Sequence, residues 1–217
     1  MKMTRAPLSR RTALGLLLST VVATSALAQG QGGKSADDVR RVEAYLNGIH
    51  TLKARFIQVA TNGGTAEGML FIKRPGKLKL DYAPPAKQMI ITTRNFVVYV
   101  DKDANQTTYQ DLNSSLAGIL VRSDIKLSGD IRVTNLTHAA GTIRIRLVLA
   151  KEPDAGSITL VFADNPLELR QWVVVDPQGN TVEVTLMNAQ FGVPIDDKEF
   201  AFVDPNSPLA PELQPRR

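Results

Sequence analysis

The sequence of 217 residues contains no cysteine, only two histidines and a single tryptophan. The absence of cysteine excludes a disulfide framework, a thiolate metal site and a lipid anchor attached to a cysteine. The two histidines, His50 and His138, have no neighbour at metal-ligand spacing, and the chain has no Gly-x-Ser-x-Gly nucleophile motif. The sequence therefore predicts no catalytic residues, no metal site and no cofactor.

The chain also has little net charge once its N-terminus is set aside. Residues 1–28 hold four basic residues and no acidic one, which leaves 22 basic against 21 acidic residues in the remainder. Proteins that bind polyanions need a concentrated basic face, and a nearly neutral body gives no general case for one. Nucleic acid is not expected as a partner.

The N-terminal segment has the three parts of an export signal. In residues 1–28 a basic stretch precedes an apolar run and small residues that end at Ala28. The run is shorter than the ~20 apolar residues of a spanning helix, which favours cleavage after Ala28 over retention as a membrane anchor. The pair Arg10-Arg11 resembles a twin-arginine signal, so export by that route or by the general secretory route is left open.

The rest of the chain fits one domain. Residues 29–36 are glycine-rich and are expected to form a flexible leader, and residues 204–217 hold four prolines and are expected to form an extended tail. The domain is expected to span residues 37–203. Within 37–49, apolar residues recur at steps of three and four, which predicts a helix that begins at Asp37.

After Leu52 the apolar pattern changes to a period near two, which is typical of strands. Turn residues separate the expected strands, and the short connections favour antiparallel neighbours in a meander. Such a sheet would have long open edges unless it curls, so we expect a mainly β fold: one curved antiparallel sheet that forms an incomplete β-barrel. The expected strands are residues 53–59, 68–73, 77–82, 88–92, 96–101, 106–109, 131–136, 142–149, 157–162, 169–175, 181–189 and 199–203.

Residues 113–122 interrupt the strand pattern. Leu116, Ile119 and Leu120 have helical spacing behind asparagine and serine residues that can cap a helix. The segment is shorter than the ~12–15 residues that an isolated helix needs, so packing must order it. Together with the first helix it predicts two short helices that cover the apolar concave face, the second of which can lift away.

An arginine occupies the turn between two expected strands, in the segment Lys73-Arg74-Pro75-Gly76-Lys77. Such a run of charges usually means a solvated hairpin. Strand alternation places Arg74 on the same face as Leu70 and Ile72, and either face can be the inner one. The sequence therefore leaves the direction of Arg74 open.

Several segments, in their order along the chain, resemble the LolA family of periplasmic carriers of outer-membrane lipoproteins. The resemblance covers residues 37–205, and its most specific part is the Lys-Arg-Pro turn with the helix and sheet around it. It rests on Phe56 and Gln58, the segment 68–77, Tyr82 before Pro84-Pro85, the segment 119–122 and the segment 197–202.

The resemblance implies an incomplete barrel with a helix-covered apolar cavity that takes the acyl chains of lipoproteins. It implies that Arg74 hydrogen-bonds to the backbone of the lid and that Leu78 and Leu80, where relatives often have aromatic residues, line the cavity. Part of any such apolar set is expected to be ordinary core, since protein interiors are dense. The expected lipoprotein-binding residues are Arg74, Leu78, Leu80, Tyr82, Leu116, Ile119, Leu120, Met89, Phe96 and Trp172.

The resemblance also implies a location and partners. It implies a monomer in the periplasm that receives acylated lipoproteins from an ATP-driven releasing complex of the inner membrane. Delivery would be to the outer membrane or to a receptor there. Two other functions stay open: a periplasmic regulator that senses lipoproteins on a related half-barrel, and a carrier of another lipid such as a glycolipid.

Overall fold

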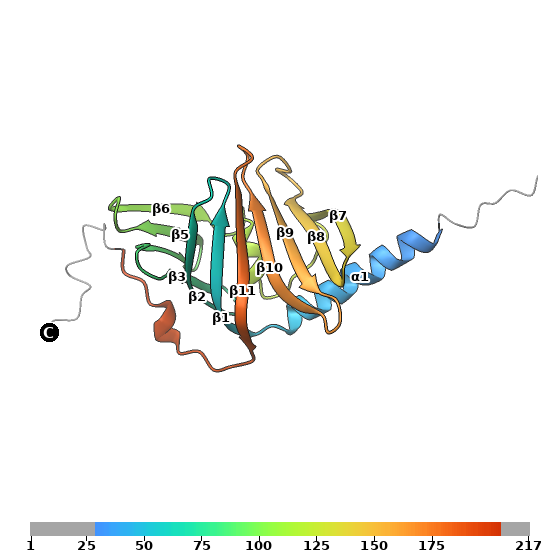
Figure 1. Cartoon of the computed structure of the whole chain (residues 1–217), viewed down its shortest axis with the longest axis horizontal. Coiled ribbons are helices and arrows are strands. Elements are labelled where there is room, and N and C mark those ends of the chain that lie inside the picture. The colour runs from blue at the N-terminus through green and yellow to red at the C-terminus, as the bar shows by residue number, and fades with distance from the viewer. Residues whose placement is uncertain (1–28, 205–217) are drawn as a thin grey trace, which may run out of the picture.

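The structure, a computed structural model, describes residues 29–204 (Figure 1). Within this range it contains one sheet of 11 antiparallel strands, one α-helix and two short 3-10 helices. The expected export signal and residues 205–217 of the expected tail lie outside the described residues. Of the helices within 29–204, none is long and apolar enough to cross a bilayer.

The sheet combines two meanders that meet in its middle. The first runs from β1 to β6, the second from β7 to β11, and β1 pairs with β11 to join them. Among the described strands, β6 and β7 are the two edges and do not pair, so the sheet is not closed. The strands are β1 (Thr51–Ala60), β2 (Thr65–Lys73), β3 (Lys77–Tyr82), β4 (Gln88–Thr92), β5 (Phe96–Asp101), β6 (Gln106–Asp111), β7 (Ile131–Ala139), β8 (Thr142–Leu149), β9 (Ser157–Ala163), β10 (Glu168–Val175) and β11 (Thr181–Phe191).

This arrangement confirms the predicted fold class of a single, incompletely closed antiparallel sheet. Alternation along the strands sorts side chains between an apolar inner face and a wetter outer face. In β8, for example, Ile143 and Ile145 are fully buried, whereas Arg144 and Arg146 are exposed. The expected meander is interrupted once, between β6 and β7, where residues 112–130 connect the two edges.

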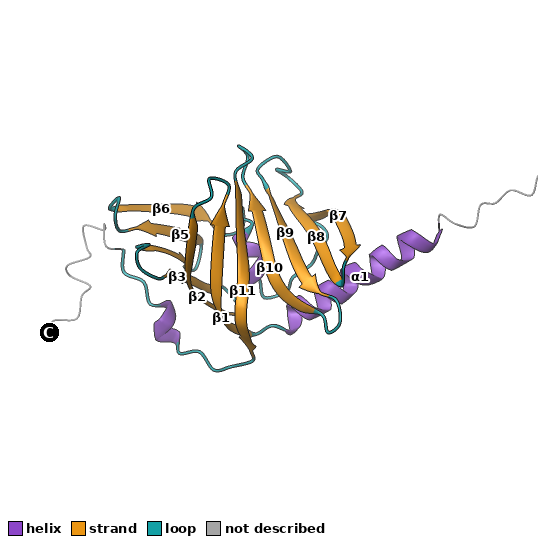
Figure 2. Ribbon diagram, viewed as in Figure 1, coloured by secondary structure: helices purple, strands orange, loops and turns teal. Residues whose placement is uncertain are grey.

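Helix α1 (Gln29–Gly48) covers part of the inner face and buries Val42 and Leu46 in the main core (Figure 2). The helix begins at Gln29, so the predicted start at Asp37 after a flexible leader is wrong. Residues 29–36 hold glycines but no proline. Glycine weakens a helix by about 1 kcal/mol per residue, which does not prevent a helix from extending through it.

The second covering segment is the 3-10 helix η1 (Ala117–Val121), which replaces the longer helix expected over 113–122. Side-chain hydrogen bonds hold the residues that lead into η1 in turns. Asp111 Oδ1 accepts from the backbone N–H of Asn113, and Ser115 Oγ accepts from the N–H of Gly118 at 3.0 Å. Such local bonds compete with α-helical bonding. Figure 2 shows η1 on the same side of the sheet as α1.

After β11 the chain turns at Gly192 and crosses the outer face as residues 192–204, here called the C-terminal strap. The strap contains η2 (Asp197–Phe200), and the strand expected at 199–203 is wrong. Phe200 and Phe202 are two residues apart, which is the spacing of a strand, because an extended backbone turns both rings toward the sheet. Phe202 packs on an outer-face cluster of Ile91, Val98 and Val100 instead of joining a ladder.

Candidate functional site

A cavity of about 500 Å³ lies between the inner face of the sheet and the η1 segment. Its walls include Leu78 and Leu80 of β3, Trp172 of β10 and Val184 of β11, which are all nearly buried. The side chains of one strand face reach it together because alternate residues point the same way. Its roof is the segment from Ser114 to Leu120. The volume lies in the ~300–1,000 Å³ range of ligand pockets.

Polar groups gather at one part of this otherwise apolar lining. Gln58, Tyr82, Tyr99 and Gln110 line the cavity beside Ile90. Tyr82 O–H donates to Gln58 Oε1 at 2.6 Å, and Tyr99 O–H lies 3.5 Å from Gln110 Oε1. Burial raises the pKa of both tyrosines, that of Tyr82 to about 12, so both phenols are neutral donors at physiological pH.

Arg74 points inward and ties the two covering segments to the β2–β3 turn. Its Nε donates to the carbonyl oxygen of Arg122 at 2.7 Å, directly after η1, and its Nη2 lies 3.4 Å from the carbonyl oxygen of Ser123. Its Nη1 donates to the carbonyl oxygens of Leu46 and Ile49, at the end of α1. The guanidinium therefore binds backbone carbonyls where α1 and η1 end, at the negative ends of the helices.

The turn that carries Arg74 is itself fixed. Gly76 has φ +81°, a left-handed conformation that glycine adopts without strain. Its N–H donates to the carbonyl oxygen of Val121 at 2.7 Å, and its own carbonyl oxygen accepts from Thr92 Oγ1 at 2.7 Å. Burial lowers the pKa of Arg74, while the charge of Asp124 opposes that shift, and an arginine so placed remains charged.

The covering segments also bind each other. Asn47 of α1 donates through Nδ2 to the carbonyl oxygen of Ile125 and accepts through Oδ1 from its N–H, both at 2.9 Å. Glu43 Oε2 accepts from the N–H of Leu127 at 2.9 Å. We call α1 and residues 112–127 the lid, because these bonds join them into one covering unit over the inner face.

The other end of α1 is fastened to the far edge of the sheet. Asp38 lies 2.7 Å from His138 Nε2 in β7, and Arg41 donates to Asp164 Oδ1 at 2.7 Å after β9. The lid is thus attached near the β7 edge by the Arg41–Asp164 ion pair and the Asp38–His138 contact, and at the β2–β3 turn by hydrogen bonds to Arg74. Within residues 29–204, no group of three or more His, Asp or Glu side chains is placed to hold a metal ion.

The structure brings together most, but not all, of the residues singled out from the sequence. Arg74 lies at the join of lid and turn, and Ile119 is fully buried in the core. In a 3-10 helix, residues three apart share a face, which pairs Ala117 with Leu120 at the cavity and turns Ile119 away. The sequence-predicted residues that line the cavity are Leu78, Leu80, Tyr82, Leu116, Leu120 and Trp172.

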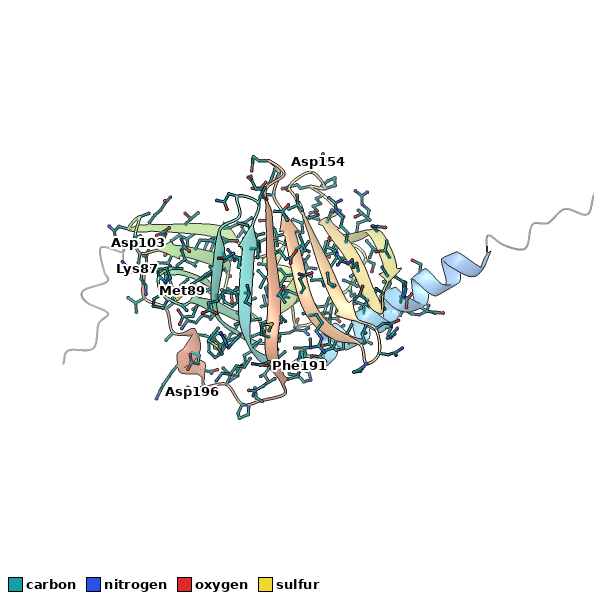
Figure 3. All side chains as sticks on the ribbon, in the orientation of Figure 1. Lys87, Met89, Asp103, Asp154, Phe191 and Asp196 are labelled. Atoms are coloured by element: carbon teal, nitrogen blue, oxygen red, sulfur yellow. The ribbon has the colours of Figure 1, made fainter. Side chains whose placement is uncertain are left out.

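Met89 and Phe96 lie on the outer face instead. Met89 precedes the cavity residue Ile90 in β4 and therefore points the opposite way, toward the cluster under the C-terminal strap. Phe96 is 41% exposed and packs edge-on against Tyr109. Figure 3 shows Met89 at the β4–β6 end of the sheet, far from Phe191 at the end of β11. The side chain of an apolar residue in a strand can thus point to either face of the sheet.

Sequence reasoning missed the polar residues that join the lid. Glu43 and Asn47 are four residues apart on α1 and therefore lie on one helix face. That spacing was the available signal, but a polar pair on a helix usually indicates a solvated face. The cavity residues Ile90 and Tyr99 were missed as well, because their strands are apolar on both faces.

Comparison with known proteins gives the family. The profile of the family described as outer membrane lipoprotein carrier protein LolA matches residues 47–203. An outer-membrane lipoprotein carrier protein of Pseudomonas aeruginosa is 28% identical over 190 residues, which cover 82% of this chain and 90% of the relative. One from Methylococcus capsulatus is 24% identical over 173 residues, with 76% and 83% covered.

Among solved structures, the chain is similar to a LolA superfamily protein from Nitrosomonas europaea. It is 9% identical, with a TM-score of 0.44, and the match covers 76% of this chain and 97% of that one. The family assignment rests on the sequence profile, which spans most of the described residues from the end of α1 to the strap. The chain belongs to the LolA family of outer membrane lipoprotein carrier proteins.

Proposed function

We propose that this protein carries lipoproteins through the periplasm, with their acyl chains held in the cavity beneath the lid. The observation that carries the proposal is the apolar cavity of about 500 Å³, roofed by a segment that hydrogen bonds tie down. The family and its curated relatives, which are named lipoprotein carriers, support the same function. The cargo would be an acylated lipoprotein, and the carrier would act as a monomer.

The energetics of acyl chains explain why such a carrier needs a covered cavity. Each methylene group exposed to water costs about 0.8 kcal/mol relative to burial, so three chains amount to tens of kcal/mol. A cavity of about 500 Å³ is the size of an ordinary small-ligand site. A triacylated anchor is larger, so loading requires the lid to move away from the sheet.

Arg74 would set the balance between loading and release. Hydrogen bonds with a charged partner contribute roughly 1.5–3 kcal/mol each, and several around one guanidinium are not additive. The closed, empty state is therefore favoured by a few kcal/mol, far less than the burial of acyl chains offers. Cargo can open the lid, and the bonds that re-form when the cavity empties favour its release.

The remaining partners follow from this role. Cargo would come from an ATP-driven complex that releases lipoproteins from the inner membrane, and it would be delivered to the outer membrane or to a receptor there. The expected export signal would bring the chain to the periplasm. No covalent step is part of the proposal.

Depletion of the protein in the bacterium that makes it tests the function directly. Lipoproteins destined for the outer membrane should accumulate in the inner membrane, as followed by membrane fractionation. Unchanged localisation would contradict a carrier and favour a sensing role. Mass spectrometry of lipid bound to the protein from the periplasm should find lipoprotein acyl chains, and a glycolipid in their place would indicate another cargo.

Replacing Arg74 tests the role of the lid in transfer. The Arg74→Leu protein should accept lipoprotein from the inner membrane at least as well as the wild type, but its hand-over should fall about tenfold or more, since each 1.4 kcal/mol is a factor of ten. Acceptance and hand-over are measured separately with purified components. Arg55→Leu is the matched control, because Arg55 pairs with Glu67 at 3.0 Å on the outer face. Normal hand-over by Arg74→Leu would reject this role.

A further inference from the structure

A second hollow adjoins the apolar cavity on the inner face of the sheet. It has a volume of about 360 Å³ and shares Gln58, Tyr82, Ile90 and Tyr99 with the cavity. A ligand that passes from the cavity past these shared residues leaves apolar walls and meets polar ones. That sequence of surfaces suits an amphiphile whose polar part lies next to its hydrocarbon chains. Besides Met89 and Val100, the walls of the second hollow are the polar residues Gln88, Asp101, Gln106 and Thr108.

A hydrogen-bonded pair, Gln58 and Tyr82, stands at the junction of the two hollows. The Tyr82 ring is held edge-on by Phe56, with centroids 5.1 Å apart and planes at 82°. Phe56 lies on β1 and Tyr82 on β3, and they meet across Gly68 of β2. A Cβ atom at Gly68 would lie only 2.8 Å from the Phe56 ring, so the glycine is what allows this contact. The phenol is therefore a fixed part of the wall.

The pair presents a hydrogen-bond donor to the junction. Because burial raises the pKa of Tyr82 to about 12, the phenol keeps its proton and donates it to Gln58 Oε1. The oxygen of Gln58 is thus occupied, whereas its amide nitrogen has no hydrogen-bond partner among residues 29–204. An amide nitrogen offers two N–H donors. The half-buried amide nitrogen is therefore available to donate to a ligand acceptor, at a net gain of the order of one hydrogen bond.

We infer that Gln58 and Tyr82 form a subsite for the carbonyl oxygens that join acyl chains to their polar backbone, in esters or amides. The inference rests on the proposed function, because it takes the cavity to hold acyl chains. A carbonyl oxygen is a neutral acceptor located where hydrocarbon ends, which is where the pair lies. A phosphate or free carboxylate fits less well, since Asp101 and Glu152 line the two hollows.

The test compares two ligands that differ only in their carbonyl groups, dioctanoylglycerol and its dioctyl ether analogue. Binding to the purified protein is measured by displacement of a fluorescent fatty acid. The wild type should bind the ester about two- to tenfold more tightly, the factor that one net hydrogen bond supplies. Equal affinities would overturn the subsite and leave the carrier function standing, whereas failure to bind either ligand would overturn both.

Variants of the pair assign the preference to its source. Gln58→Glu keeps an oxygen that accepts from Tyr82 but removes the N–H donors, and Gln58→Met removes the amide without adding charge. Both should abolish the ester preference while the ether still binds, and Tyr82→Phe should weaken it. Gln190→Glu makes the same charge change at an exposed position of β11 and should keep the wild-type ratio. A Gln58→Met protein that retains the full preference would refute the subsite, even if Gln58→Glu failed to fold.

Discussion

Two segments cover the sheet, and both are fastened to the turn between β2 and β3. On the inner face, Arg74 of that turn binds neutral backbone carbonyls of the lid. On the outer face, Lys73 and Lys77 of the same turn bind the carboxylate of Asp197 in the C-terminal strap, at 2.7 and 2.9 Å. The strap packs on a closed apolar cluster through Phe202. The lid instead roofs a cavity of about 500 Å³.

The difference indicates which covering can move. Phe202 of the strap packs directly on the outer-face cluster, so removing it would expose apolar surface with nothing to replace it. The η1 part of the lid has a hollow beneath it, and directional hydrogen bonds tie it to its neighbours. A ligand that fills the hollow supplies apolar contacts in place of the hydrogen bonds that are lost when the lid opens. A covering made to open is therefore recognised by the hollow beneath it and by bonds to its backbone.

The comparison would break if η1 were loosely attached along its whole length. Ile119 is fully buried in the core, so Ile119→Ala should lower the free energy of unfolding by about 2–5 kcal/mol. Leu116→Ala, at the cavity side, should lower it by well under half as much, since its neighbours already border a void. Urea unfolding of both variants measures the two losses of free energy. Equal losses would show that core packing fills the cavity.

Asn47→Ala sharpens the same comparison at the contact between α1 and the part of the lid that follows η1. The substitution leaves the N–H and carbonyl groups of Ile125 without their partner, at a cost of about 1–3 kcal/mol. Amide hydrogen exchange over residues 117–127 should become about tenfold faster or more, while β1 and β11 stay protected. Asn113→Ala, at an exposed position before η1, is the control. Uniform acceleration in all elements would mean global destabilisation and not opening of the lid.

The smallest effect is expected at the ion pairs of the strap. Hydrogen bonds from Lys73 and then Lys77 lower the pKa of Asp197 to about 2. Because the folded state favours the carboxylate, its contribution to stability is present above about pH 4 and is lost as the pH falls toward about 2. The difference in Tm between the wild type and Asp197→Asn should therefore shrink over that range. A difference for Asp197→Asn that stays constant over this range would contradict the shift.

Residue patterns were sufficient to predict the fold and part of the cavity. Alternation in 77–82 placed Leu78 and Leu80 on one face, and the break in the strand pattern after residue 112 located the roof. The direction of Arg74 could not be predicted, because a strand with apolar residues at consecutive positions, such as Leu70, Phe71 and Ile72, does not show which face is inside. That question is settled by what covers each face.

The same limit explains the errors at Met89, Phe96 and residues 199–203. Met89 and Phe202 are apolar because they pack on an outer-face cluster that the strap covers over β4 and β5, and Phe96 packs on Tyr109 of the same face. A sequence pattern records that a side chain is covered but not by which segment, and the strap comes from the far end of the chain. The bonds of Asn47 and Glu43 were hidden for the related reason that their partners are backbone atoms, which carry no residue identity.

Because the edge strands β6 and β7 do not pair, strand pairing does not fix the diameter of this sheet. In a closed barrel, strand number and stagger fix the diameter. Here the β1–β11 pairing joins the two meanders on one side, and the loop from 112 to 130 and α1 join them on the other. Separation of the β6 and β7 edges would break no interstrand hydrogen bond, although it would break the bonds of the lid. A sheet open at these edges would let one sequence admit anchors of different bulk.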